Sequence, residues 1–280
     1  VQQTRRMEFI RGRGWPALTA DLVATSVFRW VYTQAPLAPR SFTKVAKRNG
    51  VAPLRTVASL LTADRNLLTE MAWELDGFRM PPGFERIGPM FAHIDAPLPP
   101  IVGELAAASQ PLVYLALGSS ADRRLALATA RALGELPVNV VAPIRHYLDA
   151  GDRVPSNVHV TDLLPAHELG GLVDAAVLHG GQGTVQTACA TGVPFVGMGL
   201  QPEQTWHVRS CERRGNAIAV SPKDVSKPAF LSAVRRILEE PRFREVAADV
   251  RDAYAREDGA AAAARLIEEE ISRRSTGSAV

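Results

Sequence analysis

The sequence predicts an α/β fold, a doubly wound parallel sheet that follows a partial and mostly helical N-terminal segment. From residue 112 onward, short apolar segments alternate with amphipathic ones, a rhythm typical of parallel βαβ units. Two of the apolar segments end in glycine-rich turns, at residues 118–120 and 180–183. A doubly wound sheet binds its ligands at such strand ends. Residues 1–95 lack this alternation.

The first region, residues 1–95, is expected to be part of a domain. Amphipathic helices are predicted at 17–33 and 42–48, and short strands at 66–69 and 84–87. Residues 90–100 then contain three prolines after a Gly-Pro turn, a composition typical of a linker. We place the linker itself at residues 96–104.

The second region, residues 105–273, is expected to be the ligand-binding domain, and residues 274–280 a flexible tail. Its predicted strands are residues 112–117, 138–142, 157–161, 175–178, 194–198 and 217–220. Its predicted helices are residues 122–133, 167–172, 185–191, 206–214, 227–239, 242–255 and 260–273.

The composition argues against nucleic acid and against a membrane span. Lys and Arg number 32 against 29 Asp and Glu, and no basic cluster is interleaved with aromatic residues. The stretch 15–31 is interrupted by Pro16, Asp21 and Arg29, so it falls short of a transmembrane segment. We interpret it as a helix packed on protein, with a helix that borders a greasy substrate pocket or a membrane surface as the alternative.

The two cysteines and the first residues favour a cytoplasmic location. Cys189 and Cys211 are far apart in the sequence, show no zinc spacing and are expected to be ordinary core or helix residues. Residues 1–6 have no apolar core and are not a signal peptide. Both observations suit a reducing compartment.

The run from His179 to Thr184 is the most informative stretch. The apolar segment 175–178 precedes it, and a short helix closed by Gly192 follows it. A strand, a glycine-rich turn and a helix start place unpaired backbone N–H groups and a positive helix end in one spot, which is an anion site. His179 and Thr184 add side-chain donors. The sequence therefore predicts a phosphate-binding turn.

Three other patches could converge with this turn. Gly118-Ser119-Ser120 offers hydroxyl and N–H donors after the first strand of the second region. Leu163, Leu164 and Pro165 offer an apolar face and backbone groups to a flat base. Glu203 and Gln204 pair a carboxylate with an amide, which suits the hydroxyls of a sugar. Each patch alone is weak, and neither GxGxxG nor GxxxxGK[ST] is present.

Residues 112–220 resemble the C-terminal, donor-binding domain of the GT-B glycosyltransferases, above all bacterial enzymes that decorate natural products and are related to plant and animal UDP-sugar transferases. The resemblance is carried by YLALGSS at 114–120, DLLPAHEL at 162–169, DAAVLHGGQGTVQTACATGVPFVGM at 174–198 and PEQTWHV at 202–208. A fainter similarity, at 67–90, matches the end of that family's N-terminal domain.

The resemblance implies a role for each patch. The diphosphate of a UDP- or dTDP-sugar would lie on Ser119, His179, Gly180, Gly181, Gln182, Gly183 and Thr184. Leu163, Leu164 and Pro165 would hold the base, and Glu203 and Gln204 the transferred sugar. A helix end and a histidine would then stabilise the leaving group, so no metal and no cofactor beyond the nucleotide-sugar are expected.

Three departures from the family pattern affect donor recognition. Plant relatives carry a tryptophan where Leu163 stands and a ribose-binding Glu where Thr187 stands, so UDP and dTDP both remain open. Glu203 replaces the commoner Asp.

The resemblance also implies a general base, a His near the first strand of the N-terminal domain. Residues 1–95 hold too few strands for such a domain, and we identify no catalytic residue in this chain. We expect sugar transfer with inversion to a small, lipophilic acceptor. The alternative is a non-catalytic or split-enzyme subunit that binds nucleotide-sugar and partners an intact enzyme. A homodimer or a partner chain is possible in either case, and a nucleotide-sugar epimerase is a less favoured third reading.

Overall fold

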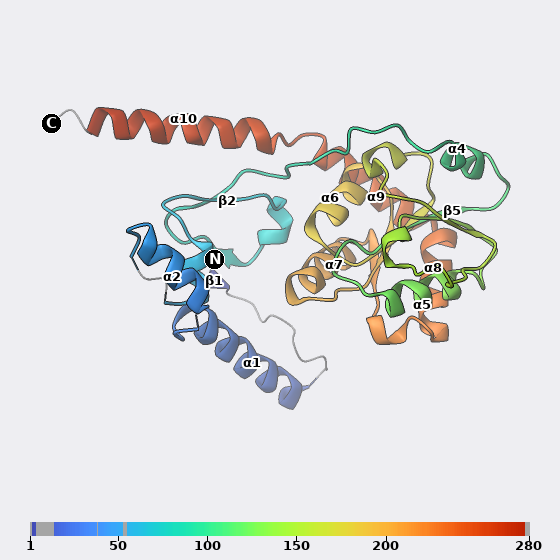
Figure 1. Ribbon diagram of the computed structural model, residues 1–280, viewed down its shortest axis with the longest axis horizontal. Coiled ribbons are helices and arrows are strands. Elements are labelled where there is room, and N and C mark those ends of the chain that lie inside the picture. The colour runs from blue at the N-terminus through green and yellow to red at the C-terminus, as the bar shows by residue number, and fades with distance from the viewer. Residues whose placement is uncertain (1, 4–13, 38, 53–54, 278–280) are drawn as a thin grey trace. The chain divides into compact units, whose positions relative to one another are not determined.

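The computed structural model describes residues 2–3, 14–37, 39–52 and 55–277 (Figure 1). The chain divides into two compact units. Unit 1 comprises Val1–Gly88 and Gly259–Val280, and unit 2 comprises Pro89–Asp258. We describe each unit by itself.

This division differs from the predicted one at both ends. The boundary falls after Gly88 rather than at residues 96–104, and the last helix belongs to unit 1 rather than to the ligand-binding region. The physical reason is local packing: Ile87 lies in an apolar cluster with Ala263 and Leu266. In addition, Arg65 forms an ion pair with Glu270 at 3.1 Å.

Unit 1 is built mainly of helices, as expected. Its helices are α1 (Trp15–Thr33), α2 (Arg40–Arg48), α3 (Val57–Leu61) and α10 (Gly259–Gly277), with the 3-10 turn η1 (Ala72–Leu75). Its strands form two small pairs, β1 (Gln2–Gln3) with β3 (Phe78–Arg79) and β2 (Asn66–Leu68) with β4 (Phe84–Arg86). The predicted helices and the strands at 66–69 and 84–87 are present, whereas α3, β1 and β3 were not expected.

The last helix extends into residues 274–280, for which the sequence predicts a flexible tail. Helix α10 continues to Gly277, because Arg274 bridges to Glu270 at 2.8 Å and to Asp64 at 2.9 Å. The remaining part of that prediction, residues 278–280, lies outside the described residues.

Unit 2 contains the predicted doubly wound sheet, and this prediction is confirmed. Six parallel strands follow the order β10-β9-β8-β5-β6-β7. Counted along the chain, this is the 3-2-1-4-5-6 order of a Rossmann-type sheet, whose switch point lies between β5 and β8. The strands are β5 (Leu112–Ala116), β6 (Asn139–Ala142), β7 (Val158–Val160), β8 (Ala175–Leu178), β9 (Phe195–Gly197) and β10 (Ala217–Ala219).

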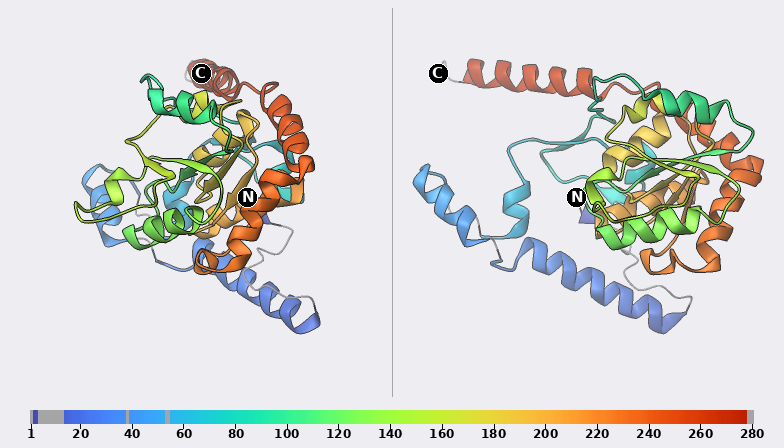
Figure 2. Two further views of the ribbon diagram at one scale, coloured as in Figure 1. Left: turned by 90° about the vertical axis from the view of Figure 1, so that its right-hand side faces the viewer. Right: turned by 45° about the vertical axis from the view of Figure 1, so that its right-hand side comes forward.

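Helices cover this sheet (Figure 2). They are α4 (Pro100–Ala106), α5 (Arg123–Leu133), α6 (Gln182–Ala190), α7 (Pro202–Arg214), α8 (Pro228–Glu239) and α9 (Pro241–Tyr254). Short 3-10 turns are η2 (Arg145–Tyr147), η3 (Ala166–Leu169) and η4 (Pro222–Asp224). The helix expected at 167–172 is only the turn η3, and α4 occupies the end of the expected linker with Val102 and Leu105 buried.

The two faces of β5 have different surroundings, since alternate side chains of a strand point to opposite faces of the sheet. Val113 and Leu115 are fully buried in the main core with residues of α5 and α8. Tyr114 and Ala116 point to the other face, where α6 packs next to β8. The first face stabilises the unit, and the second leaves room for a ligand.

Cys189 and Cys211 are buried free thiols, on α6 and α7 respectively. Their sulfurs lie 3.7 Å apart, so the two helices are in close contact but not covalently joined. Their placement in the helix core agrees with the prediction.

Candidate functional site

The two glycine-rich turns flank the switch point of the sheet. Gly118-Ser119-Ser120 follows β5, and His179-Gly180-Gly181 follows β8. The two strands are hydrogen-bonded neighbours, with Ala116 paired to Leu178. The predicted convergence of these patches is therefore a consequence of the strand order.

The imidazole of His179 is held between two glycines. A Cβ at Gly118 would lie 2.4 Å from the ring carbon Cε1, and a Cβ at Gly181 would lie 2.4 Å from Nε2. Gly118 also has φ +58°, a conformation that disfavours other residues. Only glycine at these two positions leaves space for the ring, so the turn sequences fix the orientation of His179.

The hydrogen bonding of His179 determines which ring nitrogen carries a proton. Nδ1 lies 3.4 Å from the carbonyl oxygen of Ala116, and because a carbonyl only accepts, Nδ1 is the donor. Burial lowers the pKa of His179, partly offset by that hydrogen bond and by the charge of Glu203. The unliganded ring is thus favoured in its neutral form, with an unprotonated Nε2.

Helix α6 begins without a side-chain cap. Gly181 is its N-cap residue and has no side chain that could accept a hydrogen bond from the first turn. The N–H groups of a first helical turn have no partner inside the helix. Together with the positive end of the helix dipole, they can bind an anion at Gln182, Gly183 and Thr184.

Glu203 and Gln204 are neighbours at the start of α7 with different surroundings. The Glu203 side chain is exposed. Gln204 is buried: its Oε1 accepts from the Leu200 N–H at 3.1 Å, and its Nε2 donates to the Ser120 hydroxyl at 2.9 Å. Gln204 therefore joins α7 to the turn after β5, an arrangement that spacing alone did not reveal.

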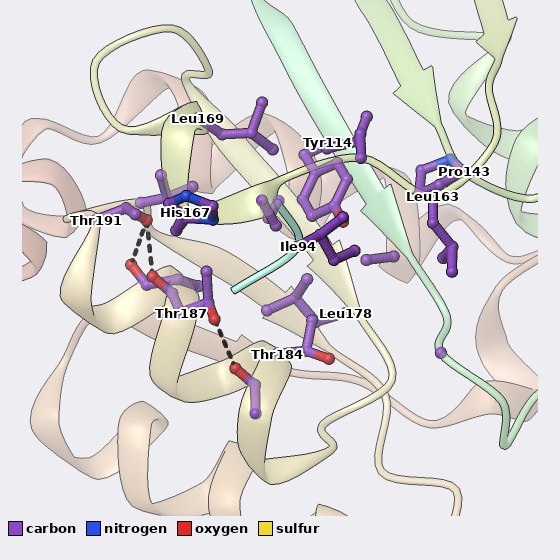
Figure 3. A pocket seen from close by; sticks show the side chains of 18 of the residues that line it. Ile94, Tyr114, Pro143, Leu163, His167, Leu169, Leu178, Thr184, Thr187 and Thr191 are labelled. Carbon is purple, nitrogen blue, oxygen red and sulfur yellow. Dashed lines mark hydrogen bonds between the residues drawn. The ribbon is translucent and has the colours of Figure 1, made fainter. Parts of the chain in front are cut away.

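A cavity of about 400 Å³ opens beside these turns (Figure 3). Gly118, Gly183 and Thr184, from the two glycine-rich turns, lie on its wall. Leu163 and Leu164, from the predicted base-binding patch, lie on the same wall. The cavity thus connects the predicted diphosphate and base patches, and ligand pockets commonly have this size.

The base-binding patch presents three different environments. Leu163 is 70% exposed, whereas the side chains of Leu164 and Pro165 are buried. Pro165 caps the turn η3, its carbonyl accepting from Glu168 N–H at 2.9 Å. Leu163 therefore offers an apolar side chain at the rim, and Leu164 lies deeper.

Exposed apolar residues gather at this cavity. In the described part of unit 2, the large apolar residues with high exposure are Met90, Phe91, Ile94 and Leu163, and all of them line the cavity. An apolar surface concentrated in one concave place is typical of a binding site.

Sequence reasoning missed several residues of this wall. From the sequence we expect Tyr114 to be part of a strand, His93 to lie in the linker, and His146 and His167 to be structural or surface residues. All four line the cavity, and the rings of His93 and His167 stack with centroids 4.1 Å apart. The apolar run at 112–117 predicts a strand, but the environment of the Tyr114 side chain depends on which strands pair with this one.

The sheet order, the glycine-flanked histidine and the adjoining cavity define a class, the C-terminal domain of GT-B glycosyltransferases. The chain belongs to the family described as "Erythromycin biosynthesis protein CIII-like, C-terminal domain", whose pattern matches residues 128–269. The family resemblance inferred from the sequence is thereby confirmed.

Several curated proteins are similar in sequence. The "PGL/p-HBAD biosynthesis rhamnosyltransferase" of Mycobacterium bovis is 28% identical over 215 residues, covering 76% of this chain and 47% of that protein. The "4'-demethylrebeccamycin synthase" of Lentzea aerocolonigenes is 36% identical over 212 residues, covering 74% and 50%. The chain thus spans about half the length of the curated relatives it matches.

Solved structures share the fold. The glycosyltransferase VinC, in complex with DTDP, has a TM-score of 0.64 and 25% identity, covering 91% of this chain and 63% of that one. SnogD from Streptomyces nogalater has a TM-score of 0.62 and 24% identity, covering 82% and 61%.

The described residues contain neither a membrane-spanning helix nor a cluster of metal ligands. None of their helices is long and apolar enough to cross a membrane. Nor do their His, Cys, Asp and Glu side chains form a group of three or more that could hold a metal ion.

Proposed function

We propose that this chain binds a nucleoside diphosphate sugar, UDP- or dTDP-linked, and belongs to an enzyme that transfers the sugar to a small, lipophilic acceptor. The cavity carries the proposal, because one space is bordered by both glycine-rich turns and by Leu163 and Leu164. Membership of a family with glycosyltransferase relatives supports it.

The diphosphate would lie at the N-terminus of α6. There the first-turn N–H groups of Gln182, Gly183 and Thr184 donate to it, and Ser119 approaches from the turn after β5. Since Nδ1 of His179 donates to Ala116, Nε2 can donate to a phosphate oxygen only when the ring is protonated. The negative diphosphate would favour that protonation.

The nucleobase and the sugar of the donor would occupy opposite sides of the diphosphate. In the described part of the chain, neither the N–H nor the C=O of Leu164 has a hydrogen-bond partner, so both are available to a base. Glu203 is exposed and is proposed to bind sugar hydroxyls. Gln204 would act mainly by holding Ser120 and α7 in place.

The proposed reaction inverts the anomeric carbon. The acceptor oxygen forms a bond to that carbon, the bond to the diphosphate oxygen breaks, and a base takes the acceptor proton. Charge on the departing diphosphate is stabilised by α6 and by protonated His179, so we propose that no divalent metal is required. The general base that takes the acceptor proton is proposed to lie outside this chain.

Titration calorimetry with UDP and dTDP tests the donor site. We expect saturable binding of at least one of them, unchanged by a chelator, and a loss of about tenfold or more in His179→Ala, the scale of one charge-assisted hydrogen bond. Absence of binding to both nucleotides would refute the site. The likeness to VinC in complex with DTDP favours the thymidine nucleotide.

A transfer assay separates the two forms of the proposal. If the chain alone binds donor but transfers no sugar, it acts as the donor-binding part of a larger or split enzyme, or as a non-catalytic partner of one. Robust transfer by the chain alone would contradict our placement of the base, although not the donor site.

A further inference from the structure

The floor of the cavity comes from one face of β5 and β8. Tyr114 pairs in register with Ala176, and Ala116 pairs with Leu178, and all of these line the cavity. The two alanines leave space that larger side chains would fill. Among these four side chains, Tyr114 is the large one that carries a polar group, and it lies beside the small side chains of Ala116 and Ala176.

The Tyr114 hydroxyl has no hydrogen-bond partner among the described residues. Figure 3 shows its ring pointing into the cavity, toward Ile94. By contrast, the hydroxyls of Thr187 and Thr191 on the same wall donate to carbonyls of their own helix, each at 2.8 Å. Burial raises the pKa of the phenol, so Tyr114 remains protonated and can both donate and accept.

We propose that Tyr114 is a donor-binding residue whose hydroxyl hydrogen-bonds the pyrimidine base of the donor nucleotide. This inference rests on the proposed function, since it assumes that the nucleotide occupies the cavity. The diphosphate would lie at Gly183 and Thr184, the base would extend past Leu164, and the phenol would meet a base carbonyl or imide group.

The surroundings favour a base over a sugar at this place. Ile94, Leu163 and Leu178 line the cavity with apolar side chains, against which the faces of a flat ring can pack. A sugar has hydroxyls on every side, and most would lie against these groups without partners, at a cost for each buried one. A pyrimidine concentrates its polar atoms along one edge, which a phenol and the backbone of Leu164 can reach together.

Calorimetry with three probes tests the assignment: dTDP, UDP and inorganic pyrophosphate, which shares only the diphosphate. In Tyr114→Phe we expect about tenfold weaker binding of both nucleotides, the effect of one lost hydrogen bond to a buried group. Pyrophosphate should bind within about twofold of the wild type, because the ring remains and the α6 turn is untouched. Tyr32→Phe, the same change in unit 1, is the matched control and should alter none of the three.

Each of the other outcomes contradicts one specific part of the proposal. Unchanged nucleotide binding in Tyr114→Phe overturns the role of the hydroxyl, and an equal loss for pyrophosphate places its effect on the diphosphate instead. The criterion is the ratio of nucleotide to pyrophosphate affinity, which a partial loss of folded protein does not change. A wild-type chain that binds neither nucleotide overturns the proposed function and the base assignment with it, and binding of pyrophosphate alone would then support only an anion site at the α6 turn.

Discussion

Unit 2 and unit 1 place their apolar side chains in opposite ways. Unit 2 buries its strands on both faces, and its exposed large apolar residues gather at a single cavity. In the described part of unit 1, exposed apolar residues are spread over several helices, among them Val27 and Trp30 on α1 and Phe42 on α2. Burial of apolar area is the main stabilising term in folding. The contrast indicates that unit 2 carries most of the stability of this chain.

The largest expected effect is on stability and differs between the units. Phe230 is fully buried in unit 2, so Phe230→Ala should lower the free energy of unfolding by about 3–5 kcal/mol. Trp30 is 59% exposed, so Trp30→Ala in unit 1 should change it by about 0.5 kcal/mol or less. Urea unfolding followed by circular dichroism measures both. If the two variants lowered the free energy of unfolding by similar amounts, the proposed difference in stability between unit 2 and unit 1 would be contradicted.

Nucleotide should stabilise unit 2 selectively. At one hundred times its dissociation constant, a nucleotide adds about 2.7 kcal/mol to the state that binds it. Amide exchange in unit 2 should slow accordingly, while exchange in α1 of unit 1 stays as before. Equal protection in both units would mean that the binding site is not confined to unit 2, and His179→Ala should abolish most of the effect.

The pH dependence of unit 2 should reflect His179. Burial lowers the pKa of this residue in the folded chain, so below its ordinary value of about 6.5 the unfolded chain binds more protons. Unit 2 should therefore lose stability as the pH falls through the window between the ordinary and the lowered pKa. The slope for one proton is at most about 1.4 kcal/mol per pH unit.

Two comparisons check that assignment. His179→Gln should lack this part of the pH dependence. Saturating dTDP should flatten or reverse the slope, because the diphosphate favours the protonated ring. Identical pH profiles for the wild type and the glutamine variant would exclude His179 as the titrating group.

A small stability effect of the opposite sign is expected at Gly183. A Cβ there meets nothing within 4 Å, and the residue lies in the first turn of α6. Gly183→Ala should stabilise unit 2 by about 1 kcal/mol or less, yet weaken nucleotide binding because the methyl group enters the cavity. Gly181→Ala is the informative control, since the new Cβ would collide with His179. This variant should reduce both the stability of unit 2 and its nucleotide binding. Normal nucleotide binding in Gly183→Ala would place the diphosphate elsewhere.

What could be predicted from the sequence depended on short-range patterns. The strand 175–178, the turn at His179 and the following helix are contiguous, so their structure and their anion-binding geometry could be inferred together. The alternation after residue 112 likewise predicted the sheet. The base-binding role of Leu163 and the sugar-binding role of Glu203 rested on side-chain chemistry and on the family resemblance, and both stay predictions.

What could not be predicted depended on distant partners. Helix α10 belongs with unit 1 because Glu270 forms an ion pair with Arg65, and Arg274 with Asp64. These partners lie some two hundred positions earlier in the sequence. Tyr114 faces the cavity because of its register with Ala176. Helix α4 was hidden because Pro99 and Pro100 suggested a linker, although proline is also favoured at the first position of a helix.

The glycines that flank His179 define a slot the shape of one aromatic ring. If His179 is shortened to glycine, the backbone at Gly118 and Gly181 should still bound that slot, open toward the start of α6. Free imidazole added to the solution should then be able to occupy it and restore part of the lost nucleotide affinity, by chemical rescue. Larger heterocycles should be excluded by the same walls, so the turn would act as a selective receptor for the side chain it lost.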